Sequence, residues 1–145
     1  MPGAASLAAG QYYAHPRNQF WTLVGEILGF DARAPYASRV AQLGQAGVAV
    51  WDVVASCARA GSLDSGIDDR SIVVNSFTTF LAAHPRIERI CFNGRMAELA
   101  WRRHVRPGLS ASRAPDYFPL PSTSPAHAAM SYGRKLRVWR SALTG

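Results

Sequence analysis

One short segment concentrates side chains that can act on water or on a nucleic-acid base. It runs Gln11-Tyr12-Tyr13-Ala14-His15-Pro16-Arg17-Asn18-Gln19-Phe20-Trp21. The amide of Asn18 can position a water molecule, because its oxygen accepts a hydrogen bond and its nitrogen donates one. The rings of Tyr12 and Tyr13 can stack on a base, and His15 can donate to one. Each also has a structural interpretation: Asn18 as a helix N-cap, the tyrosines as a lid on the core, and His15 as a hydrogen-bonded loop residue.

A second segment is rich in hydroxyl groups and proline: Leu120-Pro121-Ser122-Thr123-Ser124-Pro125-Ala126-His127. Residues 121–127 are called the Ser/Pro loop below. Short hydroxyl side chains on a backbone stiffened by proline are suited to donating hydrogen bonds to phosphate oxygens. The structural alternative is an ordinary surface turn, with His127 either adding a phosphate contact or capping a following helix.

Other site chemistries are less well supported. The four histidines are scattered along the chain, at His15, His84, His104 and His127. Without an acidic pair beside them they predict no metal site, and we expect no cofactor. Asp52 is better explained as a hydrogen-bonded carboxylate at a strand end than as a base. The chain has no G-x-S-x-G motif of a serine hydrolase. Cys57 and Cys91 stand alone without CxxC spacing, which favours reduced thiols over a disulfide or zinc site.

The charge of the chain is strongly positive. Its 145 residues include 16 Lys+Arg and 9 Asp+Glu, for a formal net charge of +7. Such a surplus attracts polyanions, of which nucleic acid is the commonest. Two basic groups stand out: Arg102, Arg103 and Arg106, and then Arg134, Lys135, Arg137 and Arg140. The alternative is the solvated surface of an arginine-rich protein, so the charge alone does not decide.

The sequence indicates one domain and no export. No run of about 18 apolar residues could span a membrane. The N-terminus, MPGAASLAAG, has no basic region before an apolar core, so a secretory signal is not supported. We expect a cytoplasmic protein, a monomer, and no membrane partner.

Hydrophobic spacing predicts helices alternating with strands after an N-terminal loop of residues 1–19. A helix is expected to begin at Asn18 and end at Gly29, and others to cover Ala37–Leu43, Val74–His84 and Met96–Val105. In the helix over residues 96–105 we expect one face to hold Ala97, Ala100, Trp101 and His104. A basic C-terminal helix should bury the stripe Tyr132, Leu136, Trp139 and Leu143 and expose its charges. Strands are expected at Val48–Ala55, as a buried parallel strand, at Ile87–Phe92 and at Tyr117–Leu120, with a long loop over Ser56–Asp69.

This alternation is typical of an α/β domain with a mainly parallel sheet. Ligands of such sheets bind at loops beyond the carboxyl ends of the strands. The loops that start at Ser56, Asn93 and Pro121 lie at such ends, and the segment before Asn18 would do so if a strand preceded it.

Taken together, the motifs resemble the uracil-DNA glycosylase superfamily, most closely its hypoxanthine-DNA (deoxyinosine) glycosylase branch. The similar pattern there is G-S-M/F-P-G, a short Ser-Leu linker, then Y-Y-x-H-P-x-N-x-F-W, and near the end an L-P-S-T-S-P loop. This chain has Met1-Pro2-Gly3, Ser6-Leu7, the run from Tyr12 to Trp21, and the Ser/Pro loop. Trp51-Asp52-Val53, Ser56-Cys57, Gly61-Ser62-Leu63-Asp64 and Phe92-Asn93-Gly94 follow the same branch in the same order.

The resemblance implies a three-layer α/β/α domain that hydrolyses the N-glycosidic bond of a damaged base in DNA. It implies catalytic roles for Asn18, which would position the water, and for His15. Implied base-binding residues are Pro2, Gly3, Tyr12, Tyr13, Ser56 and Asn93. Implied DNA-binding residues are Ser122, Thr123, Ser124, Pro125, His127, Arg134 and Lys135. For Asn93-Gly94 and Ser56 a purely structural role stays open.

The N-terminus departs from the family pattern. In the family a strand and a G-S dipeptide precede the Met/Phe, whereas this chain starts at Met1 in that place. We therefore expect residues 1–145 to be a single glycosylase-like domain that lacks its first strand, with the native start lying upstream.

The expected function is that of a monofunctional DNA glycosylase acting on hypoxanthine in single- or double-stranded DNA. Uracil or the thymine of a G·T mismatch is the alternative substrate. Two alternatives come from other functional classes. The first is a non-catalytic DNA-binding remnant of the same fold, and the second is a module that binds RNA or nucleotides.

Overall fold

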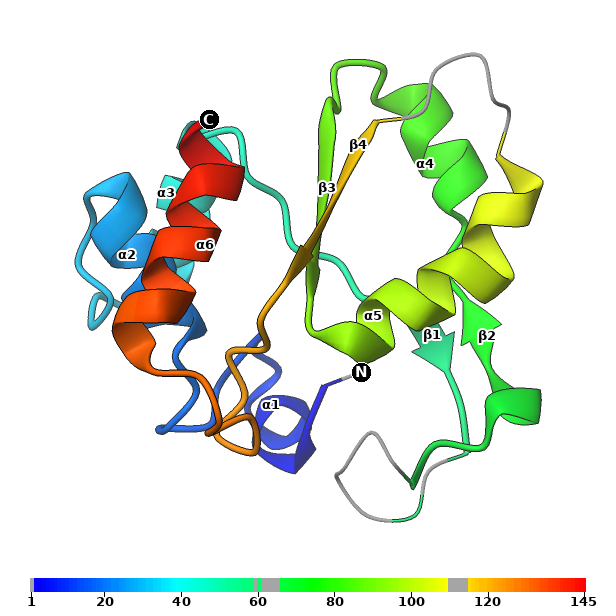
Figure 1. The fold of residues 1–145 in the computed structure, drawn as a ribbon, viewed down its shortest axis with the longest axis horizontal. Helices are drawn as coiled ribbons and strands as arrows, with labels where there is room; N and C mark the ends of the chain where they lie inside the picture. Colours follow the sequence, from blue (N-terminus) through cyan, green and yellow to red (C-terminus); the bar gives the residue numbers. More distant parts are fainter. Residues whose placement is uncertain (1, 59, 61–65, 110–114) are drawn as a thin grey trace. The chain divides into compact units, whose positions relative to one another are not determined.

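The computed structural model describes residues 2–58, 60, 66–109 and 115–145. They divide into two compact units, shown in Figure 1. The terminal unit is built from both ends of the chain, Pro2–Trp51 and Pro121–Gly145, and the middle unit comprises Asp52–Leu120. The Gly61–Asp64 motif and much of the loop predicted over Ser56–Asp69 lie outside the described residues.

The terminal unit is helical: α1 covers Ala4–Ala9, α2 Phe20–Leu28, α3 Tyr36–Gln45 and α6 Tyr132–Thr144. The helix predicted between Asn18 and Gly29 is confirmed as α2, and Gly29 ends it in the left-handed region (φ 80°) that glycine adopts without steric cost. The predicted Ala37–Leu43 helix is confirmed and longer, because Gly44 lies inside α3 instead of ending it. The buried core of this unit consists of Phe20, Trp21, Leu23, Val24, Phe30, Leu43, Trp139 and Ala142.

The prediction that residues 1–19 form only a loop is wrong for Ala4–Ala9. This stretch, AASLAA, is helical as α1, and Gly10 ends it in the left-handed region (φ 59°). Alanine has the highest helix propensity, so the composition favoured a helix that the surrounding glycine and proline obscured.

The middle unit combines short strands and helices. Its elements are β1 (Val54–Ser56), η2 (Asp69–Ser71), β2 (Val73–Val74), α4 (Phe77–Ala83), β3 (Arg89–Asn93), α5 (Arg95–Ala100), the π-helix η3 (Trp101–Val105), η4 (Arg106–Gly108) and β4 (Asp116–Leu120). Phe77, Phe92, Trp101 and Val105 form its buried core.

The strands β3 and β4 run parallel, in register from Arg89 opposite Asp116 to Asn93 opposite Leu120. Helix α5 follows β3 through Gly94 (φ 96°), so β3, α5 and β4 form the strand-helix-strand unit that the sequence predicted. The α/β class is confirmed. The described strands form two two-stranded sheets, β1–β2 and β3–β4.

The prediction of a buried parallel strand over Val48–Ala55 is wrong for most of that range. Only β1 is a strand, and it pairs antiparallel with β2, with Val54 opposite Val74. The Trp51 side chain is 40 % exposed, so the segment is not covered on both faces. Its run of β-branched and aromatic residues favours an extended backbone but does not specify a strand partner.

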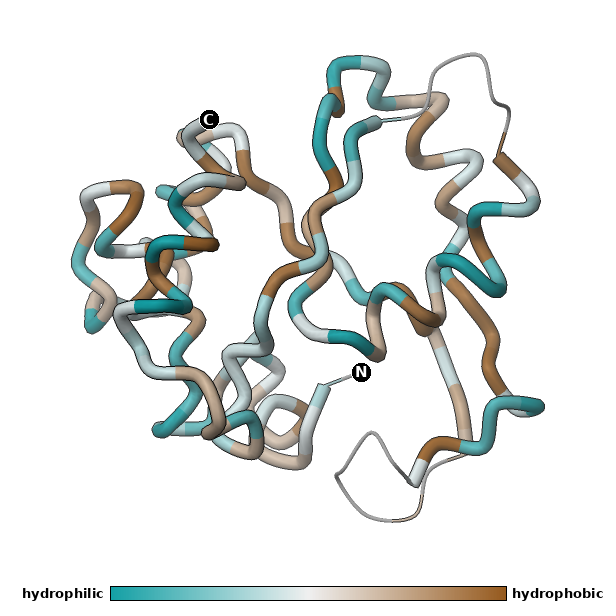
Figure 2. The backbone as a smooth tube through the Cα atoms, in the orientation of Figure 1, coloured by the Kyte–Doolittle hydropathy of each residue, from teal (hydrophilic) through white to brown (hydrophobic). Residues whose placement is uncertain are grey.

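Two helical faces differ from the prediction. In η3 the Arg106 N–H bonds to the Trp101 carbonyl, five residues back, and this wider turn brings Val105 to the core and leaves His104 exposed. Of the stripe predicted for helix α6, Trp139 is buried, but Tyr132, Leu136 and Leu143 are only half-buried, and Lys135 and Ala142 are buried with Trp139. Figure 2 shows how hydrophilic and hydrophobic residues alternate along α6. None of the described helices is both long and apolar enough to cross a membrane.

Candidate active site

Asn18 lies where the N-terminal loop enters α2. Its Oδ1 accepts a hydrogen bond from the Phe20 N–H at 3.0 Å, and its own N–H donates to the His15 carbonyl at 2.9 Å. Because a backbone N–H can only donate, the amide presents its oxygen to Phe20 and its nitrogen elsewhere. The N-cap position of α2 is held by Gln19, without a side-chain capping bond, so the contact of Asn18 with the first turn comes from one residue before the expected cap. A second lone pair of Oδ1 and both Nδ2 protons can still bind water, so this contact and water positioning are compatible.

His15 is an exposed residue three positions before Asn18. Its Nδ1 accepts a hydrogen bond from the Arg17 N–H at 3.1 Å. An accepting Nδ1 carries no proton, which places the proton of the neutral ring on Nε2. The side chain therefore offers one N–H donor for an electron-rich ligand atom.

The backbone of Tyr12 is held on both sides. Its N–H donates to the Tyr36 hydroxyl at 3.1 Å, and its carbonyl accepts from Trp21 Nε1 at 2.9 Å. The next residue, Tyr13, has a left-handed backbone (φ 55°), which is uncommon outside glycine. Its ring stacks on Phe20 with 4.0 Å between centroids, as the aromatic-lid interpretation expects. Residues with such a backbone cluster at functional sites.

The Ser/Pro loop is shaped by its own hydroxyl groups. Ser122 Oγ accepts from the Ser124 N–H at 3.2 Å, and Ser124 Oγ accepts from the Ala126 N–H at 3.3 Å. In each case the hydroxyl acts as an acceptor and keeps its own proton, which can be donated to a ligand oxygen. The backbone closes a further turn from the His127 N–H to the Ser124 carbonyl at 3.0 Å.

Three contacts fix this loop within the terminal unit. The Gln19 N–H donates to the Thr123 carbonyl at 3.0 Å, so the middle of the loop is joined to the residue next to Asn18. Trp139 Nε1 donates to the Pro121 carbonyl at 3.0 Å, and Lys135 Nζ to the His127 carbonyl at 2.9 Å. The two segments that the sequence singled out at opposite ends of the chain are therefore hydrogen-bonded neighbours.

Lys135 differs from the expectation that the basic residues of α6 all face the surface. It is only 2 % exposed, and burial lowers the pKa of its ammonium group. The neighbouring Arg134 is exposed. A signal was present in the sequence, because Lys135, Trp139 and Ala142 continue a helical stripe at spacings of four and three. Gln19, which Lys135 contacts, had no distinguishing signal of its own.

The other predicted site residues are more dispersed. Pro2 and Gly3 precede α1 in the terminal unit, and a Cβ added at Gly3 would meet no atom within 4 Å. Ser56 ends β1 and Asn93 ends β3, both in the middle unit. Among the described residues no group of three His, Cys, Asp or Glu side chains could hold a metal ion.

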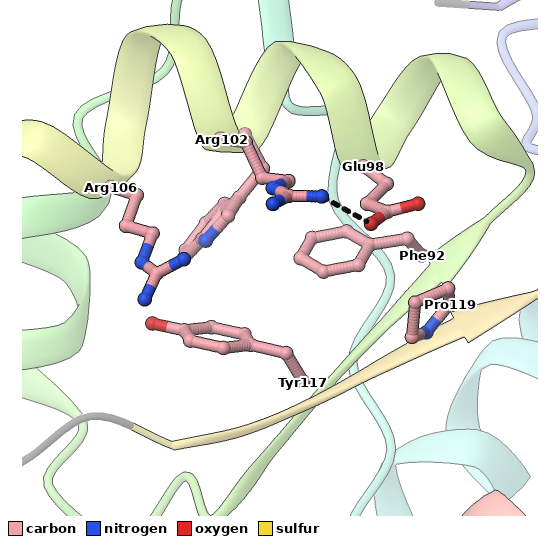
Figure 3. Close-up of a pocket in the computed structure, with 7 residues that line it drawn as sticks. Phe92, Glu98, Arg102, Arg106, Tyr117 and Pro119 are labelled. Carbon is pink, nitrogen blue, oxygen red and sulfur yellow. Dashed lines mark hydrogen bonds and ion pairs between the residues drawn. The ribbon is translucent and has the colours of Figure 1, made fainter.

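The middle unit also holds a small pocket of about 190 Å³ between η3, α5 and the β3–β4 pair. Figure 3 shows Glu98 and Arg102 of the helical segment facing it opposite Tyr117, with 3.4 Å between Arg102 Nη1 and Glu98 Oε1. Its volume is below the roughly 300–1,000 Å³ of typical small-molecule sites. None of the predicted site residues lines it, so the candidate site is built on Asn18, His15 and the Ser/Pro loop.

Comparisons with known proteins identify the class. The fold matches the solution NMR structure of a candidate uracil DNA glycosylase from Methanosarcina acetivorans, with a TM-score of 0.78 and 31 % sequence identity over 98 % of this chain and 83 % of that one. The chain belongs to the uracil-DNA glycosylase superfamily. No family model matches it.

Two curated relatives extend the comparison. The chain is 35 % identical over 96 residues to the hypoxanthine DNA glycosylase of Methanosarcina barkeri (strain Fusaro), covering 66 % of this chain and 60 % of that protein. It is 37 % identical over 98 residues to the hypoxanthine DNA glycosylase of Methanosarcina acetivorans, covering 67 % and 61 %. The alignments thus span about three fifths of these relatives, and they agree with the branch that the motifs indicated.

Proposed function

We propose that this protein is a DNA glycosylase that hydrolyses the N-glycosidic bond of hypoxanthine flipped out of DNA. The observation that carries the proposal is the junction at Gln19. There a loop with phosphate-binding chemistry is hydrogen-bonded to the residue beside a water-positioning amide. Similarity to two proteins named hypoxanthine DNA glycosylase supports the choice of base.

In the proposed reaction, the deaminated base leaves the stack because a mismatched pair lowers the free energy needed to flip the base out. Bond cleavage builds positive charge on the sugar and negative charge on the departing base. Asn18 accepts a hydrogen bond from the attacking water through the second lone pair of Oδ1, or donates one to it through Nδ2, and so fixes it against the sugar carbon. The hydroxyl of the water forms the new bond to that carbon, and its remaining proton neutralises the departing base. Because Phe20 holds the amide in place, little reorganisation is needed when the bond breaks.

His15 and the tyrosines are assigned to the base. The Nε2–H of His15 donates to the electron-rich edge of the leaving base, where negative charge develops. Tyr12 and Tyr13 supply aromatic surface beside it, and base–aromatic stacking contributes about 1–3 kcal/mol per base. Pro2 and Gly3 are assigned to close approach of the backbone to the base.

The DNA backbone is assigned to the Ser/Pro loop and α6. The hydroxyl protons of Ser122 and Ser124 and the side chain of His127 are assigned to phosphates, Pro125 stiffens the loop, and the exposed Arg134 adds positive charge. Thr123, predicted as a further DNA contact, is 0 % exposed, so we assign it to holding the loop through the bond that its carbonyl accepts from Gln19. We further propose that the protein acts as a monomer in the cytoplasm.

The test is strand scission on three labelled duplexes that carry inosine, uracil or a G·T mismatch, followed by alkali to cleave abasic sites. The proposal expects scission of the inosine duplex and little of the others. Scission of the uracil or G·T duplex instead would favour the alternative substrate, which the name of the NMR relative makes the next candidate. Binding without scission of any duplex would favour a non-catalytic DNA-binding protein.

A further inference from the structure

Lys135 is the only lysine in a chain with 16 Lys+Arg residues, and it is buried. Its Nζ donates to Gln19 Oε1 at 3.0 Å and to the His127 carbonyl at 2.9 Å. The described residues contain no ion pair between Lys135 and a carboxylate. Burying an ammonium group against two neutral oxygens carries a desolvation penalty, which an apolar side chain at the same position of the helix would avoid. This desolvation penalty suggests that the lysine is needed for the hydrogen bonds that it makes and for the positions of the groups that it joins.

The groups that Lys135 joins both belong to the proposed site. Gln19 is adjacent to Asn18, and its backbone N–H already bonds to Thr123 in the middle of the Ser/Pro loop. His127 closes the same loop. One turn further along α6, Trp139 holds the Pro121 carbonyl at the start of the loop. Lys135 and Trp139 thus hold the two ends of the loop, and Lys135 also donates a hydrogen bond to the side chain of the residue next to Asn18.

A lysine suits this position better than an arginine. Its ammonium is a compact charge with three donors on a slender stem, whereas a guanidinium is a broad planar fork. Two separate oxygens, one from Gln19 and one from His127, converge on a single nitrogen here, which a point donor satisfies directly.

We propose that Lys135 is a positioning residue and not a phosphate contact: it sets the Ser/Pro loop against Gln19, and through Gln19 it sets Asn18 at the reaction centre. This inference rests on the proposed function. It replaces the DNA contact that the sequence suggested for Lys135 and leaves that suggestion in place for Arg134.

The experiment compares Lys135→Met with Arg134→Met, two neighbouring substitutions that each remove one positive charge. Three quantities are measured for each protein: single-turnover base release from the inosine duplex at saturating enzyme, the salt dependence of duplex binding, and amide hydrogen exchange by NMR. For Lys135→Met we expect base release to fall about 10- to 100-fold, since small misplacements of reacting groups have effects of that size. Its salt slope should match the wild type.

For Arg134→Met the expected signature is the opposite one. The slope of log K against log salt should fall by about 0.9, the value for one phosphate contact. Exchange of the Gln19 amide, which bonds to Thr123, should accelerate about 10-fold or more in Lys135→Met only. The Val24 amide, inside α2, should exchange as in the wild type in both variants, which separates local release from general destabilisation.

A second variant separates loss of the hydrogen bond from loss of folding. Gln19→Leu removes the same hydrogen bond from the other side and should lower base release without changing the salt slope. The double variant should be little worse than Lys135→Met alone, because that substitution already removes the bond to Gln19.

The outcomes distinguish the two ideas. If the wild-type protein releases base but Lys135→Met loses salt slope as Arg134→Met does, the inference about Lys135 is overturned and the proposed function stands. Unchanged Gln19 exchange in Lys135→Met also overturns the inference. If the wild-type protein releases no base from any duplex, the proposed function fails, and the salt slope and amide exchange still decide whether Lys135 braces the loop.

Discussion

Substitutions at Asn18 separate its two roles, because the contact with the Phe20 N–H uses Oδ1, whereas Nδ2 is the proposed donor to the water. Asn18→Ala removes both, including the 3.0 Å bond to the Phe20 N–H. Loss of a side-chain bond to the first turn of a helix, as at an N-cap, costs about 1 kcal/mol, or roughly 3 °C in Tm for a chain of this size. Asn18→Asp keeps an oxygen for Phe20 and adds a negative charge at a helix N-terminus, which is favourable, so its Tm should be at or above the wild-type value.

Activity should follow a different pattern. Both variants lose the Nδ2 donor, and removing one preorganised donor from a reaction centre costs about 10²–10³ in rate. We therefore expect single-turnover base release to fall by about that factor in both, although only Asn18→Ala loses stability. The assay is alkali-revealed scission of the inosine duplex, with thermal unfolding of the same samples. Wild-type rates in Asn18→Ala would refute the role of Asn18 altogether. Wild-type rates in Asn18→Asp alone would refute the need for a donor.

Further predictions concern stability. Burial, together with the hydrogen bond and charge of Glu26, raises the pKa of Tyr132 from 10.0 to about 12. The neutral phenol is therefore favoured in the folded state, and the free energy of unfolding should fall as the pH rises from about 10 to 12. In denaturant titrations at several pH values, Tyr132→Phe should lose this part of the pH dependence. Any contribution of Lys135 to the pH dependence is the same in both proteins. Gly25→Ala should destabilise by about 1–3 kcal/mol, because its Cβ would lie 2.7 Å from the Phe30 carbonyl oxygen. Gly44→Ala, inside α3 with nothing within 4 Å, should stabilise by about 0.5–1 kcal/mol, and equal Tm shifts for the two alanines would contradict the packing described.

Local signals predicted much of the fold. The start of α2 within two residues of Asn18, its end at Gly29, and the succession of β3, α5 and β4 were all predicted, because caps, glycines and short-range periodicity act over a few residues. The Val48–Ala55 segment shows the limit. Whether an extended stretch becomes a buried strand depends on which partner lies beside it, and that is decided by residues far away in the sequence.

The sequence predicted which residues form the candidate site better than it predicted which of them contact one another. Asn18 and the Ser/Pro loop were found from residue type and motif. Their link through Gln19 and Lys135 was not, because a glutamine and a lysine in a basic helix are expected at the surface. The spacing of Lys135, Trp139 and Ala142 is compatible with one buried face, and the packing of Trp139 and Ala142 in the structure shows that Lys135 does lie on it.

The construction of the terminal unit from Pro2–Trp51 and Pro121–Gly145 has a consequence for synthesis. In the folded protein the ring of Trp139 packs edge-on against Phe20 of α2. While the ribosome translates the middle of the chain, α2 has been synthesised but Trp139 has not. The apolar face of Phe20 and Trp21 must therefore wait in the nascent polypeptide, where chaperones can bind it. A polypeptide that ends before Pro121 would contain Asn18 and Gln19 but lack the Ser/Pro loop and the two residues of α6, Lys135 and Trp139, that hold it.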